Sequence, residues 1–413
     1  MKKILFITPQ LCFPPTDGGK QAQYYPIMAI GKVVETYSIM VNVDETKSAH
    51  YVGEASYEAL KDRLQDLQIV ERYNPNFQDR NVYKKFTEGL NWFCGLRPRC
   101  AQIFYSNEKK DWVMNYIKHN KINIVCIEYP YMSELIDITR LQTLGVKVVY
   151  LAHNVESILL QELYSQYPSW LKNILNVDVR KLENYEKKVL NQVDQVLAIS
   201  KLDEEYIRNQ LKIPRVAYVP VLLPDIVDRW SGNVQAEYMV FNGSMSFFPN
   251  YHGMKWLLEA IHEDLGRELS EFKIKITGKI PAHIREEFKK YPSVEFTGML
   301  SSSELSKTLQ NAKFAIIPIM KGSGTKMKIL ELMAYGIPII TTRQGVQGFD
   351  CAEQPLVVAD SPGEFYRKML MLAKDDEACA LYGAKAREFF ENNFLDSGNV
   401  DKWVNKLVTG VGG

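Results

Sequence analysis

Short apolar segments rich in β-branched residues alternate with longer amphipathic segments along the whole chain. The apolar runs have the length of buried strands, and the amphipathic segments have the period of helices. The expected strands are Lys3–Thr8, Thr36–Asn42, Ile122–Glu128, Lys147–Leu151, Gln195–Ile199 and Val216–Val219, then Tyr238–Phe241, Lys273–Thr277, Val294–Phe296, Phe314–Pro318, Pro338–Thr342 and Leu356–Val358. The clearest helical segments are Asn107–Asn120, Leu171–Leu190, Gly253–His262 and Met327–Tyr335. Because this alternation indicates parallel sheets covered on both faces, and occurs twice, it predicts two doubly wound, Rossmann-like α/β domains.

A turn-rich stretch separates the two series of strands. Pro220–Gln235 contains two prolines, a glycine and an asparagine and has no clear periodicity, which is typical of a linker. We therefore expect an N-terminal domain over residues 1–225 and a C-terminal domain over residues 226–395. Residues 396–413 are expected to form a last helix, for which the N-terminal domain is a candidate packing surface.

Composition narrows the range of partners. The 413 residues carry 50 Lys and Arg against 49 Asp and Glu, and this balance argues against a nucleic-acid partner. The six cysteines contain no Cys-x-x-Cys pair, and no apolar run is long enough to span a bilayer. A cytoplasmic protein with free thiols is expected.

The loops that follow the second series of strands carry candidate anion-binding residues. Ligands of open parallel sheets bind at the carboxyl ends of the strands, where glycines and helix N-termini expose N–H groups. Candidates are Gly243, Ser244, Gly278, Lys279, Pro318, Ser323, Gly324, Thr325 and Lys326. The segment from Lys321 to Lys328 is the most informative, because its glycines, a helix start and the positive charge of Lys321, Lys326 and Lys328 together suit a diphosphate.

Glu331 stands out because it interrupts an apolar helix. An unpaired carboxylate there would cost several kcal/mol, so it needs a partner. A ribose diol would supply two donors. A salt bridge to Lys326 or Lys328, or exposure on one face of the helix, is the alternative.

The first series of strands carries candidates at the same positions. Gly18 and Gly19 precede a helical pattern, which suits an anion or a plain surface turn. Glu128 ends one expected strand, and His153 and Asn154 follow the next. Here the location of His153 favours a functional histidine over one that merely caps a turn.

No metal site or cofactor is expected. The sequence has no Asp-x-Asp, no histidine pair with zinc spacing and no Gly-x-Gly-x-x-Gly in the first turn.

These segments, in this order, resemble the GT-B-fold retaining glycosyltransferases of family 4 (glycosyl transferases group 1). The strongest portions run from Phe241 to Asn250 and from Gly322 to Pro338, and Ala152–Glu156 looks like the family's acceptor-domain histidine motif. The resemblance implies two domains facing across a cleft, with a UDP- or GDP-linked sugar as co-substrate in the C-terminal domain. The acceptor, a glycan or a lipid-linked glycan, would occupy the N-terminal domain, and Glu331 would hold the ribose.

The chain departs from the family pattern at two places. The position of the family's first glutamate, which normally contacts the donor sugar, is occupied by Ser323. The identity of the donor sugar and its binding mode are therefore left open. Many members carry Arg and Lys after the glycine that corresponds to Gly243, whereas this chain has Ser244, Met245 and Asn250. Lys326 is our candidate for the missing charge.

The sequence thus predicts a metal-independent transferase of surface-polysaccharide synthesis. A nucleotide-sugar epimerase of the same fold and a non-catalytic nucleotide-sugar-binding protein are the alternatives. The basic, aromatic segment Asn81–Arg99 suits either a helix on the inner face of the cell membrane or an ordinary core helix.

Overall fold

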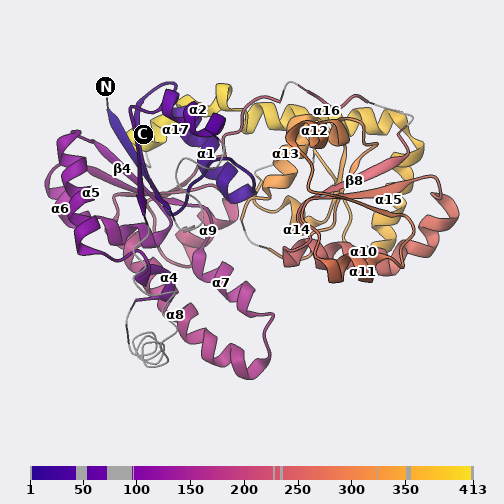
Figure 1. Cartoon of the computed structure of the whole chain (residues 1–413), viewed down its shortest axis with the longest axis horizontal. Coiled ribbons are helices and arrows are strands. Elements are labelled where there is room, and N and C mark those ends of the chain that lie inside the picture. Colours follow the sequence, from indigo (N-terminus) through magenta and orange to yellow (C-terminus); the bar gives the residue numbers. More distant parts are fainter. Residues whose placement is uncertain are drawn as a thin grey trace. The chain divides into compact units, whose positions relative to one another are not determined.

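The computed structural model describes residues 2–42, 54–71, 95, 97–226, 228–232, 236–322, 324–349 and 355–410. They form two compact units (Figure 1). Unit 1 comprises Met1–Leu223 and Val400–Gly413, and unit 2 comprises Pro224–Asn399. Each is built on one parallel sheet with helices on both faces, as the hydrophobic pattern predicts.

Unit 1 contains a seven-stranded sheet of order β3-β2-β1-β4-β5-β6-β7. Its strands are β1 (Lys3–Thr8), β2 (Glu35–Asn42), β3 (Asp66–Glu71), β4 (Ile124–Glu128), β5 (Lys147–Ala152), β6 (Gln195–Ala198) and β7 (Val216–Tyr218). Its helices are α1 (Gly18–Ile30), α2 (Glu54–Arg63), α4 (Arg99–Gln102), α5 (Asn107–His119), the 3-10 helix η1 (Pro130–Leu135), α6 (Ile138–Thr143), α7 (Glu156–Tyr164), α8 (Ser169–Gln192), α9 (Lys201–Asn209) and α17 (Asp396–Thr409). The sequence analysis missed β3, because this half-buried edge strand has no continuous apolar run.

The last helix packs on the sheet of unit 1. Along β1, Leu5 and Ile7 join the core that includes α5, whereas Phe6 lies on the opposite face. The ring of Trp403 in α17 lies 6.5 Å from that of Phe6. Its indole Nε1 donates to the carbonyl oxygen of Pro220 at 3.1 Å, so the buried indole is both packed and hydrogen-bonded.

Unit 2 contains a six-stranded parallel sheet of order β10-β9-β8-β11-β12-β13. Its strands are β8 (Tyr238–Asn242), β9 (Lys273–Thr277), β10 (Val294–Gly298), β11 (Ala315–Ile317), β12 (Ile339–Thr341) and β13 (Val357–Val358). Its helices are α10 (Phe248–Glu268), α11 (Ala282–Phe288), α12 (Ser302–Gln310), α13 (Met327–Tyr335), α14 (Arg343–Val346), α15 (Pro362–Lys374) and α16 (Asp376–Asn393). Helices α10 and α11 cover one face of this sheet, and α12, α13 and α16 cover the other (Figure 1).

Helix α10 corrects one prediction. The expected helix Gly253–His262 instead begins at Phe248 and ends at Glu268. Pro249 does not delay the helix, because a proline in the first turn removes no intrahelical hydrogen bond.

The sequence analysis also made predictions about membrane segments and about the cysteines. No helix within the described ranges is long and apolar enough to cross a bilayer. Most of Asn81–Arg99 lies outside the described residues, so the basic amphipathic helix stays a prediction. The four described cysteines, Cys12, Cys100, Cys126 and Cys379, are free thiols.

We predict opposite effects for two Gly→Ala substitutions in α10. A Cβ built on Gly253 would lie 1.6 Å from the carbonyl oxygen of Pro318, whereas one on Gly266 would meet nothing within 4 Å. Gly253→Ala should therefore lower the free energy of unfolding by about 1–3 kcal/mol, since helix and loop must separate. Gly266→Ala should raise it by up to about 1 kcal/mol through helix propensity. Urea unfolding tests both, and equal stability of the two variants would contradict the packing described.

Candidate functional site

The candidate site in unit 2 lies at the carboxyl ends of β8, β9 and β11. Along this sheet, β8 is followed in space by β9 on one side and by β11 on the other. The point between β8 and β11, where the strand order reverses, is where open parallel sheets bind ligands.

A three-residue network occupies these strand ends. Asn242, the last residue of β8, donates from Nδ2 to Oε2 of Glu331 in α13 at 3.0 Å. Its Oδ1 accepts from the hydroxyl of Thr277, the last residue of β9, at 2.7 Å. Thr277 therefore fixes the amide so that its NH₂ group faces the carboxylate. The sequence analysis missed Asn242 and Thr277, although their position at strand ends was the available signal.

Among the described residues, one side chain, that of Asn242, hydrogen-bonds to the Glu331 carboxylate. Burial raises the pKa of Glu331 to about 7, and the bond from Asn242 opposes this rise only in part. Within the described part of the chain, the other carboxylate oxygen accepts no hydrogen bond. Glu331 forms no salt bridge with Lys326 or Lys328, the alternative that the sequence left open: Lys326 donates to loop carbonyls and Lys328 to Asn250. The residue is half-buried, so the other alternative, exposure on one face of the helix, holds in part. Glu331 therefore retains acceptor capacity for a ligand.

The loop before α13 is closed by its own lysine. The amine of Lys326 donates to the carbonyl oxygens of Gly322, at 2.6 Å, and Gly324, at 2.9 Å. Gln344 Nε2 also donates to the Gly322 carbonyl, at 2.9 Å. Ser323, the position of the family's first glutamate, lies outside the described residues. The buried Lys326 thus donates to carbonyl oxygens of its own loop. The sequence analysis expected this amine to face a diphosphate and did not predict these bonds.

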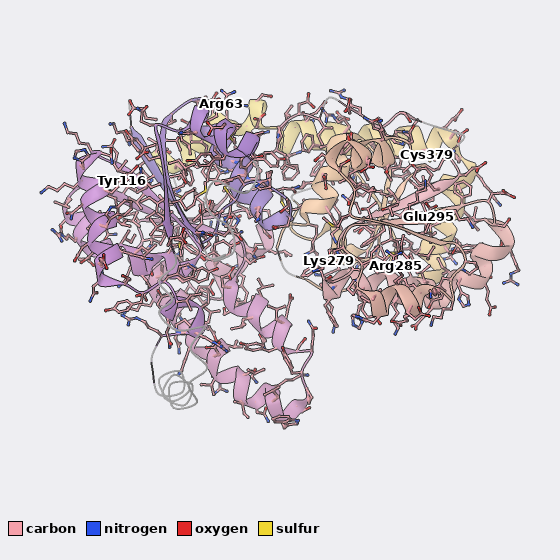
Figure 2. All side chains as sticks on the ribbon, viewed as in Figure 1. Arg63, Tyr116, Lys279, Arg285, Glu295 and Cys379 are labelled. Carbon is pink, nitrogen blue, oxygen red and sulfur yellow. The ribbon has the colours of Figure 1, made fainter. Side chains whose placement is uncertain are left out.

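The loops after β8 and β9 contact one another. Gly243 and Ser244 follow β8, and Gly278 and Lys279 follow β9, where Lys279 is exposed (Figure 2). The N–H of Met245 donates to the Lys279 carbonyl at 2.9 Å. A Cβ on Gly278, whose φ is +94°, would lie 3.1 Å from the carbonyl carbon of Gly243, so only glycine allows this approach.

The remaining candidates of unit 2 lie next to β11 and α13. Pro318 follows β11 and is buried, with its carbonyl oxygen against Gly253. Thr325 immediately precedes Lys326, the N-cap residue of α13. The described donor-side candidates of unit 2 therefore lie at the ends of β8, β9 and β11 or in the loop between β11 and α13, whereas Gly18 and Gly19 lie in unit 1.

Unit 1 brings Glu128 and His153 together. These residues end or follow the adjacent strands β4 and β5, and their Oε1 and Nε2 atoms are 3.7 Å apart. Only 1% of Glu128 and 4% of His153 is exposed. The ring of Tyr129, in the left-handed region at φ +68°, stacks on His153 with centroids 5.1 Å apart. Both ring nitrogens of His153 and Oε2 of Glu128 lack hydrogen-bond partners in the described structure. Buried polar atoms without hydrogen-bond partners are uncommon in folded proteins, and such atoms are typical of ligand-binding or catalytic sites.

A buried acidic pair borders this histidine. Asn154 follows His153 directly, and Glu156 is the first residue of α7. The carboxylate of Glu186 in α8 accepts from the backbone N–H groups of Glu156, at 2.9 Å, and Ser157, at 3.2 Å. Burial, followed by the charge of Glu186, raises the pKa of Glu156. The sequence analysis missed this pair, because no motif links residues so far apart on two helices.

Gly18 and Gly19 form the start of α1. The side chain of Asp17 caps this helix by accepting from the N–H of Lys20 at 3.0 Å. The capping carboxylate already satisfies one of the N–H groups that an anion would use. In the described ranges, no group of three or more His, Cys, Asp or Glu side chains is placed to hold a metal ion.

Comparison with known proteins gives a partial family match. Residues 236–375, which form most of unit 2, match the family model described as Glycosyl transferases group 1. An uncharacterized 44.6 kDa protein in the cps region of Klebsiella pneumoniae is 22% identical over 404 residues, which cover 95% of this chain and 97% of that protein.

Solved structures match over both units. TarM of S. aureus has a TM-score of 0.68 at 12% identity, over 99% of this chain and 99% of its own. HepE of Anabaena in complex with UDP has a TM-score of 0.66 at 11% identity, over 99% of this chain and 100% of its own. The chain has the GT-B fold. Together with the match of residues 236–375, this GT-B fold supports a glycosyltransferase of the group 1 type.

The raised pKa of Glu331 leads to a pH-dependent prediction. Between about pH 4.5 and pH 7 the folded chain holds this proton more tightly than the unfolded chain. Ionisation therefore lowers the free energy of unfolding as pH rises through this window. Glu331→Gln cannot ionise, so its stability relative to the parent should rise by on the order of 1–3 kcal/mol from pH 5 to pH 8. Urea unfolding at four pH values tests this. Glu388→Gln, at an exposed position of α16, is the control. If the stability difference between Glu331→Gln and the parent changes with pH as little as the difference for this control, the desolvation of the Glu331 carboxylate is contradicted.

Proposed function

We propose that this chain is a retaining glycosyltransferase that uses a nucleoside diphosphate sugar. It would transfer the sugar to a glycan or lipid-linked acceptor in the synthesis of a surface polysaccharide. The observation that carries the proposal is the Glu331 carboxylate, which has one protein donor and lies at the β8–β11 switch point of the segment that matches the group 1 family model.

The properties of similar proteins support this choice. HepE of Anabaena was solved with UDP and with UDP-glucose, and a TarM variant was solved with UDP and α-GlcNAc-glycerol. The relative from Klebsiella pneumoniae lies in a cps region. UDP is therefore the first nucleotide to test, with GDP as the alternative.

The chemistry proposed for unit 2 is stabilisation of the leaving group. Cleavage of the anomeric bond leaves negative charge on the diphosphate and positive charge on the sugar ring. N–H groups that precede α13, including those of Gly324 and Thr325, would receive the phosphate charge in a preorganised site. Glu331 would accept from the ribose hydroxyls, and the base would lie near Gly278 and Pro318. This chemistry needs no metal ion.

The role proposed for unit 1 is recognition of sugar hydroxyls. His153 and Glu128 present buried polar atoms without partners, and hydroxyl groups can both donate to and accept from such atoms. Asn154 adds an amide beside them. Retention by front-face attack does not require His153 to be a general base, so we assign it a hydrogen-bonding role.

Contact with a membrane, the source of a lipid-linked acceptor, is part of the proposal. The α7–α8 hairpin exposes four large apolar side chains: Leu163 at 45%, Tyr167 at 48%, Trp170 at 68% and Ile174 at 46%. From Leu163 to Val177 the sequence contains one charged residue, a lysine. Tryptophan and tyrosine favour the interface of a bilayer, and the absence of acidic side chains suits an anionic one.

Nucleotide binding should depend on Glu331. In isothermal titration calorimetry with UDP, GDP, ADP and their sugar conjugates, we expect the wild-type chain to bind one base class. Glu331→Gln should weaken this binding by about 10- to 100-fold, because a charged acceptor of the ribose is lost. Glu388→Gln, on an exposed helix face, should bind as the wild type does. Failure of the wild type to bind any nucleotide, or an unaffected Glu331→Gln, would contradict the donor site.

Product analysis separates the three candidate functions. With the nucleotide sugar that binds and a panel of glycan and lipid-linked acceptors, NMR should show acceptor-dependent transfer that keeps the anomeric configuration. A changed sugar nucleotide formed without acceptor would indicate an epimerase. Binding without turnover throughout the panel would indicate a binding protein.

The membrane contact predicts that the hairpin drives vesicle binding. The wild-type chain should float with vesicles of phosphatidylcholine and phosphatidylglycerol at low salt, and the double variant Trp170→Ser/Ile174→Ser should lose most of this binding. Trp112→Ser, at an exposed tryptophan of α5, is the matched control and should retain it. This surface would be ruled out if the wild-type chain does not float with the vesicles, or if the double variant floats as well as the wild type.

A further inference from the structure

Lys328, in the first turn of α13, lies at the end of β8. Its amine donates to Oδ1 of Asn250, and it lies 5.4 Å from the centroid of the Phe241 ring. A Cβ on Gly243 would lie 3.3 Å from Nζ. The amine therefore sits directly beneath the glycine turn that follows the strand, inside the candidate donor site.

Asn250 holds the amine in this place. This buried residue of α10 donates from Nδ2 to the carbonyl oxygen of Ser244 at 2.8 Å, while its Oδ1 accepts from Lys328. A side chain at Gly243 would approach Nδ2 of Asn250 to 2.9 Å and crowd the amine. Gly243 leaves room for the amine, and Asn250, one of the residues found where many family members carry basic residues, holds this lysine of another helix.

Within the described part of the chain, the amine of Lys328 forms no ion pair with a carboxylate. Among the described residues, no carboxylate oxygen lies within 4.0 Å of its amine. Burial and the like charge of Lys326 lower the pKa of Lys328 to about 7. The positive end of the α13 dipole adds to this repulsion, because cations are disfavoured in the first turn of a helix. The arrangement is unfavourable by itself and becomes favourable when an anion binds.

The two lysines of this segment have different surroundings. Lys326 donates to two carbonyl oxygens of the loop, and these bonds close the loop. Lys328 is bound to a neutral amide oxygen next to the Gly243 turn, where it adds charge to the N-terminus of α13.

We propose that Lys328 is the cation that binds the diphosphate of the nucleotide sugar, with Asn250 as its positioning residue. The inference rests on the proposed function. It replaces the expectation that Lys326 supplies this charge, and it assigns Lys326 to closure of the loop.

Calorimetry with UDP, UMP and uridine, or with the guanosine series if GDP is the nucleotide bound, tests this assignment. Lys328→Met should weaken binding of the diphosphate by at least 10-fold and binding of the nucleoside by less than 2-fold, since only the phosphate contact is lost. Lys385→Met, at an exposed lysine of α16, is the matched control and should change neither. Asn250→Ala should act in the same direction as Lys328→Met but more weakly.

The outcomes separate this inference from the proposed function. Thermal unfolding verifies that Lys328→Met folds, and Lys328→Gln replaces it if it does not. If the wild type binds the diphosphate and a folded Lys328 variant binds it equally well, the assignment of Lys328 is wrong and the donor site stands. If uridine binding falls as much as UDP binding, Lys328 shapes the site rather than binding phosphate, which also overturns the assignment. A wild-type chain that binds no nucleoside diphosphate contradicts the proposed function itself.

Discussion

The half-buried carboxylate of Glu331 is the constraint on which the organisation of unit 2 depends. A carboxylate inside an apolar helix is tolerated only with a hydrogen-bond donor, and Asn242 supplies one because Thr277 fixes its amide. These three residues connect α13 to the ends of β8 and β9. The same contacts leave acceptor capacity on the carboxylate. The Glu331 carboxylate, which destabilises the fold when it is ionised, is therefore also suited to accept from ribose hydroxyls.

Glycines make room for close contacts at the ends of β8 and β11. Gly253 allows α10 to approach the chain after β11, and Gly243 leaves room for the amide of Asn250 and the amine of Lys328. Positive charge therefore gathers at the N-terminus of α13, and no carboxylate among the described residues pairs with Lys328. Stability and ligand affinity are opposed here, as they commonly are at binding sites.

The sequence predicts the strands of this fold well where they are continuous apolar runs. Lys3–Thr8 and Lys273–Thr277 match β1 and β9 residue for residue, whereas the half-buried edge strand β3 lacks such a run and was missed. Glu331 was recognisable as a site residue because a carboxylate in an apolar helix is anomalous. The sequence analysis named Lys328 as added charge and as an alternative salt-bridge partner of Glu331. It did not distinguish Lys328 from Lys326, because the distinction depends on Asn250, which lies 78 residues away in the chain.

The most direct test of the account is a crystal structure of the full chain with its nucleoside diphosphate. We expect the ribose hydroxyls to donate to Glu331 and the diphosphate to lie against the N–H groups before α13 and the amine of Lys328. A nucleotide bound at another place, or one bound at the ends of β8 and β11 without contact to Glu331, would contradict the central claim.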